Sequence, residues 1–130
     1  MASQKLTGTV QTGLQEGAYY MNQDGYRKPL AEKLGFTPFT GTLNLRVNKN
    51  QLKQFIAHAQ AIPIPGFQTS ERGFGPIQCY RVKINQEIGG ALLLPDRTTH
   101  KNVAEVIARE NLRKTLSLKD GDTVSLELAK

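Results

Sequence analysis

The stretch FTGTLNLRVN, residues 39–48, sets the strand pattern from which the fold can be worked out. Apolar Leu and Val side chains alternate in it with polar ones, and this period of two is typical of a half-buried β-strand. Thr42 and Asn44 stand two residues apart, so they project from the same face of that strand. A solvent-facing strand usually carries Lys, Glu or Ser. Two neutral oxygen-bearing side chains directly after a glycine therefore indicate that this face of the strand does more than contact solvent.

Similar short strand patterns lie on both sides of this stretch, with turn residues between them. We expect strands at residues 5–12, 41–48, 75–85, 88–95, 102–108 and 122–129, a short extended piece at 19–21, and helices at 24–35, 50–60 and 110–116. In the first helix Pro29 is expected in the first turn and Gly35 at the end, and IPIPGF at 62–67 is expected to break the second helix. Regular strand–helix alternation is missing, so the pattern predicts a mainly β protein, a small closed barrel with short helices outside it.

Length, charge and cysteine content limit the kinds of protein that this chain can be. The 130 residues predict one domain, 1–130. Seventeen Lys and Arg against 11 Asp and Glu give a net charge of +6, which favours an anionic partner, although solubility alone also explains such a balance. No basic run exceeds two residues, so no nucleic-acid-binding arm is visible. Cys79 is the only cysteine, which excludes an internal disulfide, and we expect it to be a small buried residue.

The chain has no apolar run long enough to span a bilayer and no secretory signal at its start. We therefore expect a soluble, cytoplasmic protein.

Thr42 and Asn44 are the candidate metal ligands. A hydroxyl and an amide oxygen are hard neutral donors, which suit Mg²⁺. That ion usually takes one or two protein ligands and completes its shell with water and substrate phosphates. The alternative is that the two residues simply end a strand at a turn.

A glycine-bounded stretch, TGLQEGAYY at residues 12–20, follows the first expected strand. Gly13 and Gly17 allow the backbone to turn with its N–H groups inward, a shape that can hold phosphate oxygens. The stretch matches neither the Walker A nor the dinucleotide pattern, so a plain turn is the alternative.

The segment 95–116 holds Thr98, His100, Glu105 and Arg113 among apolar residues. Apolar neighbours share the face of Glu105 on the expected strand, and a partly desolvated carboxylate can act as a general base or bind a hydroxyl-rich substrate. A glutamate on an edge strand in water is the alternative. Arg113 either clamps a phosphate or lies on the surface, and His100 is interpreted as a turn residue.

The stretch LSLKDGDTVSLEL, residues 116–128, predicts a hairpin whose turn depends on the unusual backbone angle of Gly121. Segments of this kind occur in several small-barrel families, including swapped-hairpin DNA-binding regulators. The hairpin therefore indicates a barrel without indicating an activity.

Read in chain order, these segments resemble the CTP-dependent riboflavin kinases of archaea. The blocks GLQEGAYY, LGFTPFTGTLNLRV, CYRVKI, GALLLPDRTTH, EVIA and LKDGDTVSLEL stand in the order and at about the spacing of that family, and they cover nearly the whole chain. The pattern LGF-x-P-[FY]-x-GTLNL is the most specific of them. Some members carry an additional N-terminal winged-helix domain, and this chain resembles the single-domain form.

The resemblance implies a six-stranded closed cradle-loop (Greek-key-like) barrel that transfers the γ-phosphoryl group of CTP to the riboflavin 5′-hydroxyl, giving FMN and CDP. By position, it implies Thr42 and Asn44 as Mg²⁺ ligands and Thr98 and Glu105 as flavin contacts, with Glu105 as the candidate base or flavin-orienting group. The implied nucleotide contacts are Gly13, Leu14, Gln15, Glu16, Gly17, Ala18, Glu110, Asn111, Leu112 and Arg113. The expected partners are riboflavin, FMN, CTP and CDP, bound by a monomer that binds neither nucleic acid nor membrane.

Two departures from the family pattern concern the nucleotide contacts. Gln15 stands where many relatives have a further Gly, and Arg109 and Glu110 replace residues that are often apolar or Pro. Two interpretations from other classes remain open: a non-enzymatic, small-barrel DNA-binding regulator, and a barrel that binds flavin or nucleotide without catalysis. The first is expected to show a duplicated hairpin, which this chain lacks, and metal-dependent turnover would separate both from a kinase.

Overall fold

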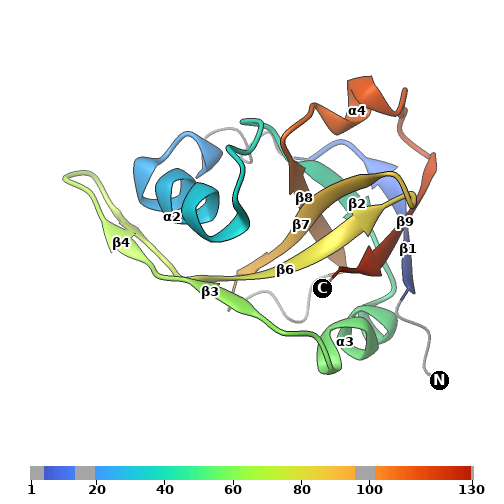
Figure 1. Cartoon of the computed structure of the whole chain (residues 1–130), viewed down its shortest axis with the longest axis horizontal. Helices are drawn as coiled ribbons and strands as arrows, with labels where there is room; N and C mark the ends of the chain where they lie inside the picture. The colour runs from blue at the N-terminus through green and yellow to red at the C-terminus, as the bar shows by residue number, and fades with distance from the viewer. Residues whose placement is uncertain (1–4, 14–19, 96–101, 130) are drawn as a thin grey trace.

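A computed structural model describes residues 5–13, 20–95 and 102–129 of the chain. Its strands are β1 (Lys5–Gln11), β2 (Leu43–Arg46), β3 (Ile62–Ile64), β4 (Phe67–Gln68), β5 (Gly73–Phe74), β6 (Ile77–Ile84), β7 (Ile88–Pro95), β8 (Val103–Ala108) and β9 (Thr123–Leu128) (Figure 1). Its helices are α2 (Asp24–Leu34), α3 (Lys49–Ala57) and α4 (Leu112–Thr115). None of the helices in these three ranges has the length and apolarity that crossing a membrane requires.

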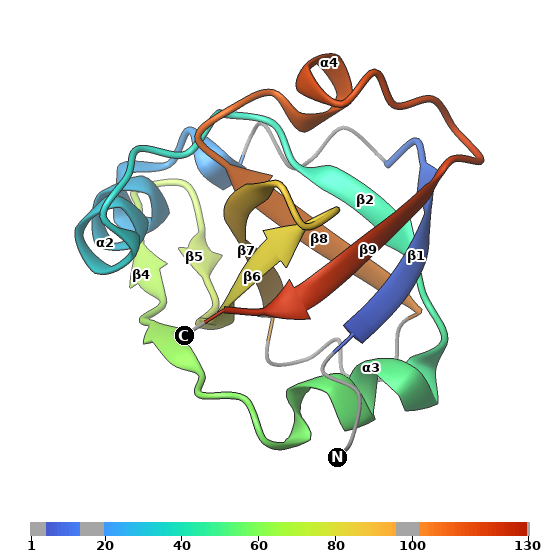
Figure 2. The same ribbon diagram turned by 45° about the vertical axis from the view of Figure 1, so that its right-hand side comes forward.

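Six antiparallel strands close on themselves into a barrel, in the order β6-β7-β8-β2-β1-β9, and pairing between β6 and β9 completes the ring (Figure 2). Strand β3 pairs antiparallel with the first residues of β6 and is followed along the chain by the small two-stranded sheet of β4 and β5. The mainly β class and the closed six-stranded barrel with short helices are therefore confirmed. Closure leaves each barrel strand paired on both sides, which removes exposed edges.

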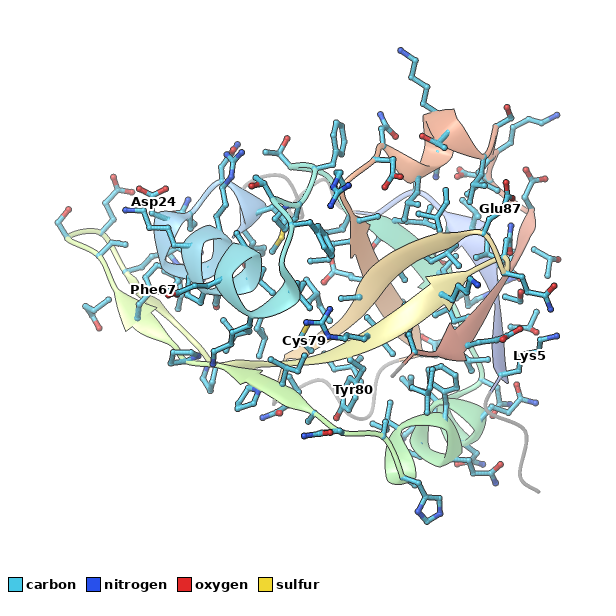
Figure 3. All side chains as sticks on the ribbon, in the orientation of Figure 1. Lys5, Asp24, Phe67, Cys79, Tyr80 and Glu87 are labelled. Atoms are coloured by element: carbon cyan, nitrogen blue, oxygen red, sulfur yellow. The ribbon has the colours of Figure 1, made fainter. Side chains whose placement is uncertain are left out.

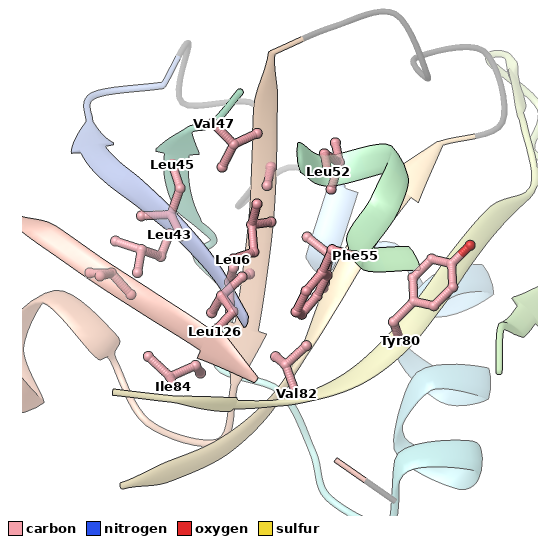
Figure 4. Packing of buried hydrophobic residues seen from close by; sticks show 14 of the residues in the cluster. Leu6, Leu43, Leu45, Val47, Leu52, Phe55, Tyr80, Val82, Ile84 and Leu126 are labelled. Atoms are coloured by element: carbon pink, nitrogen blue, oxygen red, sulfur yellow. The ribbon is translucent and has the colours of Figure 1, made fainter. Parts of the chain in front are cut away.

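The barrel is filled by the apolar residues that alternate along its strands. The inward set includes Leu6, Val10, Leu43, Leu45, Val82, Ile84, Leu92, Val106, Val124 and Leu126, all buried in one cluster (Figure 4). Helix α3 adds Leu52 and Phe55 to this cluster, and α4 adds Leu112. The two helices lie at opposite ends of the barrel in Figure 2, so each covers one opening.

A second core lies between α2 and the outer face of the barrel. Tyr26, Leu30 and Leu34 are the buried residues of α2, and they pack with the outward-facing residues of β6, β7 and β8. Cys79 belongs to this second core and Tyr80 to the barrel core, and the two side chains leave β6 on opposite sides (Figure 3). Both faces of β6 are therefore largely buried, so its sequence does not alternate cleanly between apolar and polar residues.

Helix α2 ends at the predicted residue, but its proline does not lie in the predicted turn. Gly35 adopts φ 84° directly after the helix, a left-handed angle that glycine takes without strain. Pro29 lies in the middle of the helix, so its predicted place in the first turn is wrong. A proline there removes one backbone hydrogen bond. The helix persists because one face is buried against the barrel, and packing of this kind outweighs local propensity.

Two other local predictions are wrong, and one short strand was not predicted. Tyr20 and Met21 are helical, whereas 19–21 was expected to be extended. The second helix ends before segment 62–67, as expected, and this segment adds β3 and the start of β4, which the sequence pattern did not predict. Residues 116–118 form no strand, so no hairpin joins them to β9. The turn that follows them instead pairs with β1, since the Gly121 amide donates to the Val10 carbonyl and the Val10 amide donates to the Asp122 carbonyl, both at 2.8 Å. Gly121 does have the expected positive φ, at 95°.

Candidate active site

Thr42 and Asn44 project from the outer face of the barrel at the start of β2. Leu43 and Leu45 point into the core, and Asn44 lies between them on the other face, half-buried. Thr42, also half-buried, directly precedes the strand. The alternation that fills the barrel thus places two oxygen-bearing side chains together outside it.

Glu105 lies beside these two residues. It is the direct cross-strand neighbour of Asn44 in the antiparallel pairing of β2 with β8. The Thr42 hydroxyl donates a hydrogen bond to Oε1 of Glu105, with an oxygen–oxygen distance of 3.2 Å. Strand β8 pairs with β7 on its other side, so Glu105 is half-buried within the sheet and the edge-strand alternative is wrong.

The donor set fits a hard divalent cation. Donation to Glu105 uses the hydroxyl proton of Thr42 and leaves both lone pairs of its oxygen for a ligand. Asn44 supplies an amide oxygen one pleat away, and a carboxylate stands next to both. Oxygen donors of this kind suit Mg²⁺.

The glycine-bounded loop begins against the Asn44 amide. A Cβ placed on Gly13 would lie 2.7 Å from Cγ and 3.0 Å from Oδ1 of Asn44, closer than real contacts allow. Only glycine therefore fits at residue 13 without moving Asn44. The structure thus brings together the first residue of the predicted nucleotide loop and a predicted metal ligand. The other predicted loop residues, Leu14, Gln15, Glu16, Gly17 and Ala18, and the predicted flavin contact Thr98, lie outside the described residues, as does His100.

Arg113 reaches the same end of β1 from α4. Its Nη2 donates to the Gln11 carbonyl at 3.2 Å and to Oδ1 of Asp120 at 2.5 Å. The Thr12 hydroxyl donates to Oδ2 of Asp120 at 2.6 Å. Hydrogen bonds from Thr12 and then from Arg113 hold the pKa of the Asp120 carboxyl below its usual value, so this group is ionised at neutral pH.

The rest of the predicted segment 110–113 divides into different roles. Asn111 caps α4 by accepting a hydrogen bond from the Lys114 amide at 3.3 Å, and Leu112 is buried in the barrel core. Glu110 is exposed and lines a pocket of about 330 Å³ together with Phe36, Arg81, Gly89, Gly90 and Arg109. Thr42, Asn44 and Glu105 do not line this pocket. Within this segment, Arg113 is the side chain that contacts the base of the loop.

Sequence reasoning missed Gln11 and Asp120 as neighbours of the site, and it did not predict that Thr12 of the glycine-bounded stretch bonds Asp120. Asp120 was interpreted only as part of a turn. Its hydrogen bond with Thr12 joins residues 108 positions apart in the sequence, so no local pattern predicts it. An acidic residue next to a positive-φ glycine is an ordinary turn signal and carries no hint of a distant partner.

Comparison with known proteins shows the family of this chain. The family model CTP-dep_RFKase, described as a domain of unknown function, DUF120, matches residues 10–128. Proteins named riboflavin kinase from Pyrobaculum aerophilum, Archaeoglobus fulgidus and Pyrococcus furiosus are 44%, 42% and 45% identical to this chain over 98%, 95% and 94% of its length. The chain spans 62%, 54% and 57% of the length of these three relatives. The matched region includes the end of β1, the β2 face and the α4 segment, and the chain therefore belongs to the CTP-dep_RFKase family.

Proposed function

We propose that this protein is a CTP-dependent riboflavin kinase, which transfers the γ-phosphoryl group of CTP to the 5′-hydroxyl of riboflavin and yields FMN and CDP. The observation that carries the proposal is the contact of Gly13 with Asn44 beside the Thr42–Glu105 hydrogen bond. Gly13, the first glycine of the loop proposed to hold phosphates, lies there beside a carboxylate and the two neutral side chains proposed as metal ligands. Kinase chemistry requires this combination, because phosphoryl transfer depends mainly on positioning and charge stabilisation.

Thr42 and Asn44 are the residues that would hold Mg²⁺. When bound, such an ion neutralises charge on the phosphates during transfer. Both ligands are neutral, so they leave the positive charge of the ion undiminished.

Glu105 is placed to act on the acceptor. Its carboxylate is half-buried and already accepts the Thr42 hydroxyl, so it can also accept the proton of, or orient, a substrate hydroxyl. Thr98 is the second proposed flavin contact. Residues 13–18 and 110–113 are proposed to contact CTP, mostly through backbone groups, with Arg113 supplying charge. The catalytic unit proposed is the single barrel domain of residues 1–130, acting as a monomer on small molecules and without nucleic acid or membrane.

The test is FMN formation from riboflavin with CTP or ATP, in Mg²⁺ and in chelator. We expect FMN with CTP and Mg²⁺, little with ATP, and none with chelator. Asn44→Ala should abolish most of the activity. Asn50→Ala is the matched control, since Asn50 is exposed on α3 at another end of the barrel.

The outcomes separate the alternatives. FMN with ATP alone would keep the kinase and discard the CTP preference. Absence of FMN with every donor, while flavin still binds, would favour a binding barrel without catalysis.

A further inference from the structure

A carboxylate in the turn before β9 joins two segments of the proposed nucleotide site. Asp120 accepts the Thr12 hydroxyl on Oδ2 and the Arg113 guanidinium on Oδ1. Arg113 in turn donates to the Gln11 carbonyl. One side chain thus connects the residue before Gly13 with the first turn of α4.

The turn that carries Asp120 and helix α4 are each attached to the barrel. The turn that carries Asp120 is bonded to β1 through the two hydrogen bonds between Val10 and residues 121 and 122. Helix α4 is fixed by its Asn111 cap and by burial of Leu112 in the barrel core. Asp120 therefore bonds Thr12 and Arg113 from a turn that is itself hydrogen-bonded to β1.

We propose that Asp120 is a positioning residue for nucleotide binding, holding Thr12 and Arg113 in the arrangement that the nucleotide meets. This inference rests on the proposed function. The bonds from Arg113 to Gln11 and to Asp120 both use Nη2, and they account for its two hydrogens. Neither bond uses the Nε or Nη1 donors of Arg113. Those donors are suited to binding a phosphate oxygen or the carbonyl oxygen of a base. Fixing the side chain beforehand reduces the entropy lost on binding.

The proposal makes a prediction opposite in sign to simple electrostatics. Removing a negative charge near a site for an anionic nucleotide should tighten binding if Asp120 acts only through its charge. Asp120→Asn should instead weaken nucleotide binding if the carboxylate positions Arg113. The pair is exposed, with side-chain exposures of 39% for Arg113 and 55% for Asp120, so its loss should change folding stability little.

The experiment compares wild type, Asp120→Asn and Asp122→Asn by calorimetric titration with CTP and by steady-state kinetics. Asp122→Asn is the matched control: it removes the same charge from the same turn, and its carboxylate accepts the Lys119 amide rather than Thr12 or Arg113. We expect Asp120→Asn to raise the Kd and KM for CTP about fivefold, while kcat and the KM for riboflavin change less than about twofold. The control should bind CTP as wild type does or slightly more tightly.

A companion variant tests the second arm of the carboxylate. Thr12→Val should weaken CTP binding about twofold, Thr12→Ser should restore it, and the Thr12→Val and Asp120→Asn effects should not add. Unchanged or tighter CTP binding by Asp120→Asn would overturn the positioning role while leaving the kinase intact. A wild-type protein that binds no CTP would overturn the proposed function, and the positioning role with it.

Discussion

The Thr42 hydroxyl donates its hydrogen bond to Oε1 of Glu105, across a 3.2 Å gap between two neighbouring strands. The bond fixes which way the proton of Thr42 points and so fixes what the oxygen can still do. A hydroxyl that donates to a carboxylate presents lone pairs to anything else that approaches, which is the state a cation needs. The same bond orients the carboxylate that we propose acts on the acceptor hydroxyl.

Replacement of Thr42 therefore separates metal binding from folding. Thr42→Val keeps the side-chain shape and removes the oxygen, and we expect the Mg²⁺ concentration for half-maximal FMN formation to rise about tenfold. Thr42→Ser retains the oxygen and should stay close to wild type. Titration of the initial rate with Mg²⁺ measures the effect, and Mg²⁺-induced thermal stabilisation gives a second readout. Equal Mg²⁺ dependence in all three proteins would remove Thr42 from the metal site.

Glu105→Gln tests the proposed base without changing the size of the side chain. The amide oxygen can still accept the Thr42 hydroxyl, so the fold and the metal ligands should be kept. We expect kcat to fall about 10²- to 10⁴-fold, the usual contribution of a general base, while riboflavin binding weakens far less. Single-turnover FMN formation and quenching of riboflavin fluorescence measure the two quantities. A loss in kcat below about tenfold would leave Glu105 an orienting role only.

Gly13→Ala tests the close approach of the loop to β2. The added methyl would overlap the Asn44 amide, so either the loop or the Asn44 side chain, a proposed metal ligand, must move. We expect kcat/KM for CTP to fall at least about tenfold, because a displacement near 1 Å at a reacting site costs on that scale. Gly75→Ala is the control, since a Cβ on Gly75 meets no atom within 4 Å. Wild-type activity in Gly13→Ala would show that the contact is not needed for nucleotide binding.

Sequence reasoning found the strands of the barrel from short β-forming stretches bounded by turn residues, and alternation of apolar and polar residues is clearest in β2 and β9. It also found that Thr42 and Asn44 share a face, since that follows from the strand period alone. It missed β3, because Pro63 lies in a stretch that was expected only to break the second helix. Strand β3 lies at the end of the sheet and pairs only with β6 in the described structure, and an edge strand tolerates a proline.

The partners of the site residues were less accessible from the sequence. Asn44 and Glu105 are 61 positions apart, and their register follows from the closed topology rather than from either segment. The hairpin predicted at 116–128 failed for a related reason. Local alternation suggested that residues 116–118 pair with β9, whereas β9 pairs with β1 and β6, so it has no free side for them.

Cys79 allows a test of the second core through pH. Its side chain is fully buried on the outer face of β6, and burial raises the pKa of its thiol from 9.0 to about 12, with Arg81 partly opposing the shift. Between these two values the unfolded chain loses the thiol proton and the folded chain keeps it. The folded state then binds more protons than the unfolded state, so stability must fall as pH rises.

The expected result is a difference between two proteins, which cancels the titration of Lys and Tyr residues. Relative to Cys79→Ala, the free energy of unfolding of wild type should fall by about 1 kcal/mol per pH unit above pH 9, and the difference should be flat between pH 6 and about 8. Urea unfolding at several pH values measures it, and a thiol-reactive disulfide reagent should label Cys79 only in the unfolded chain. A difference that stays constant from pH 7 to about 10.5, or rapid labelling of the native protein, would contradict the burial of Cys79 between α2 and the barrel.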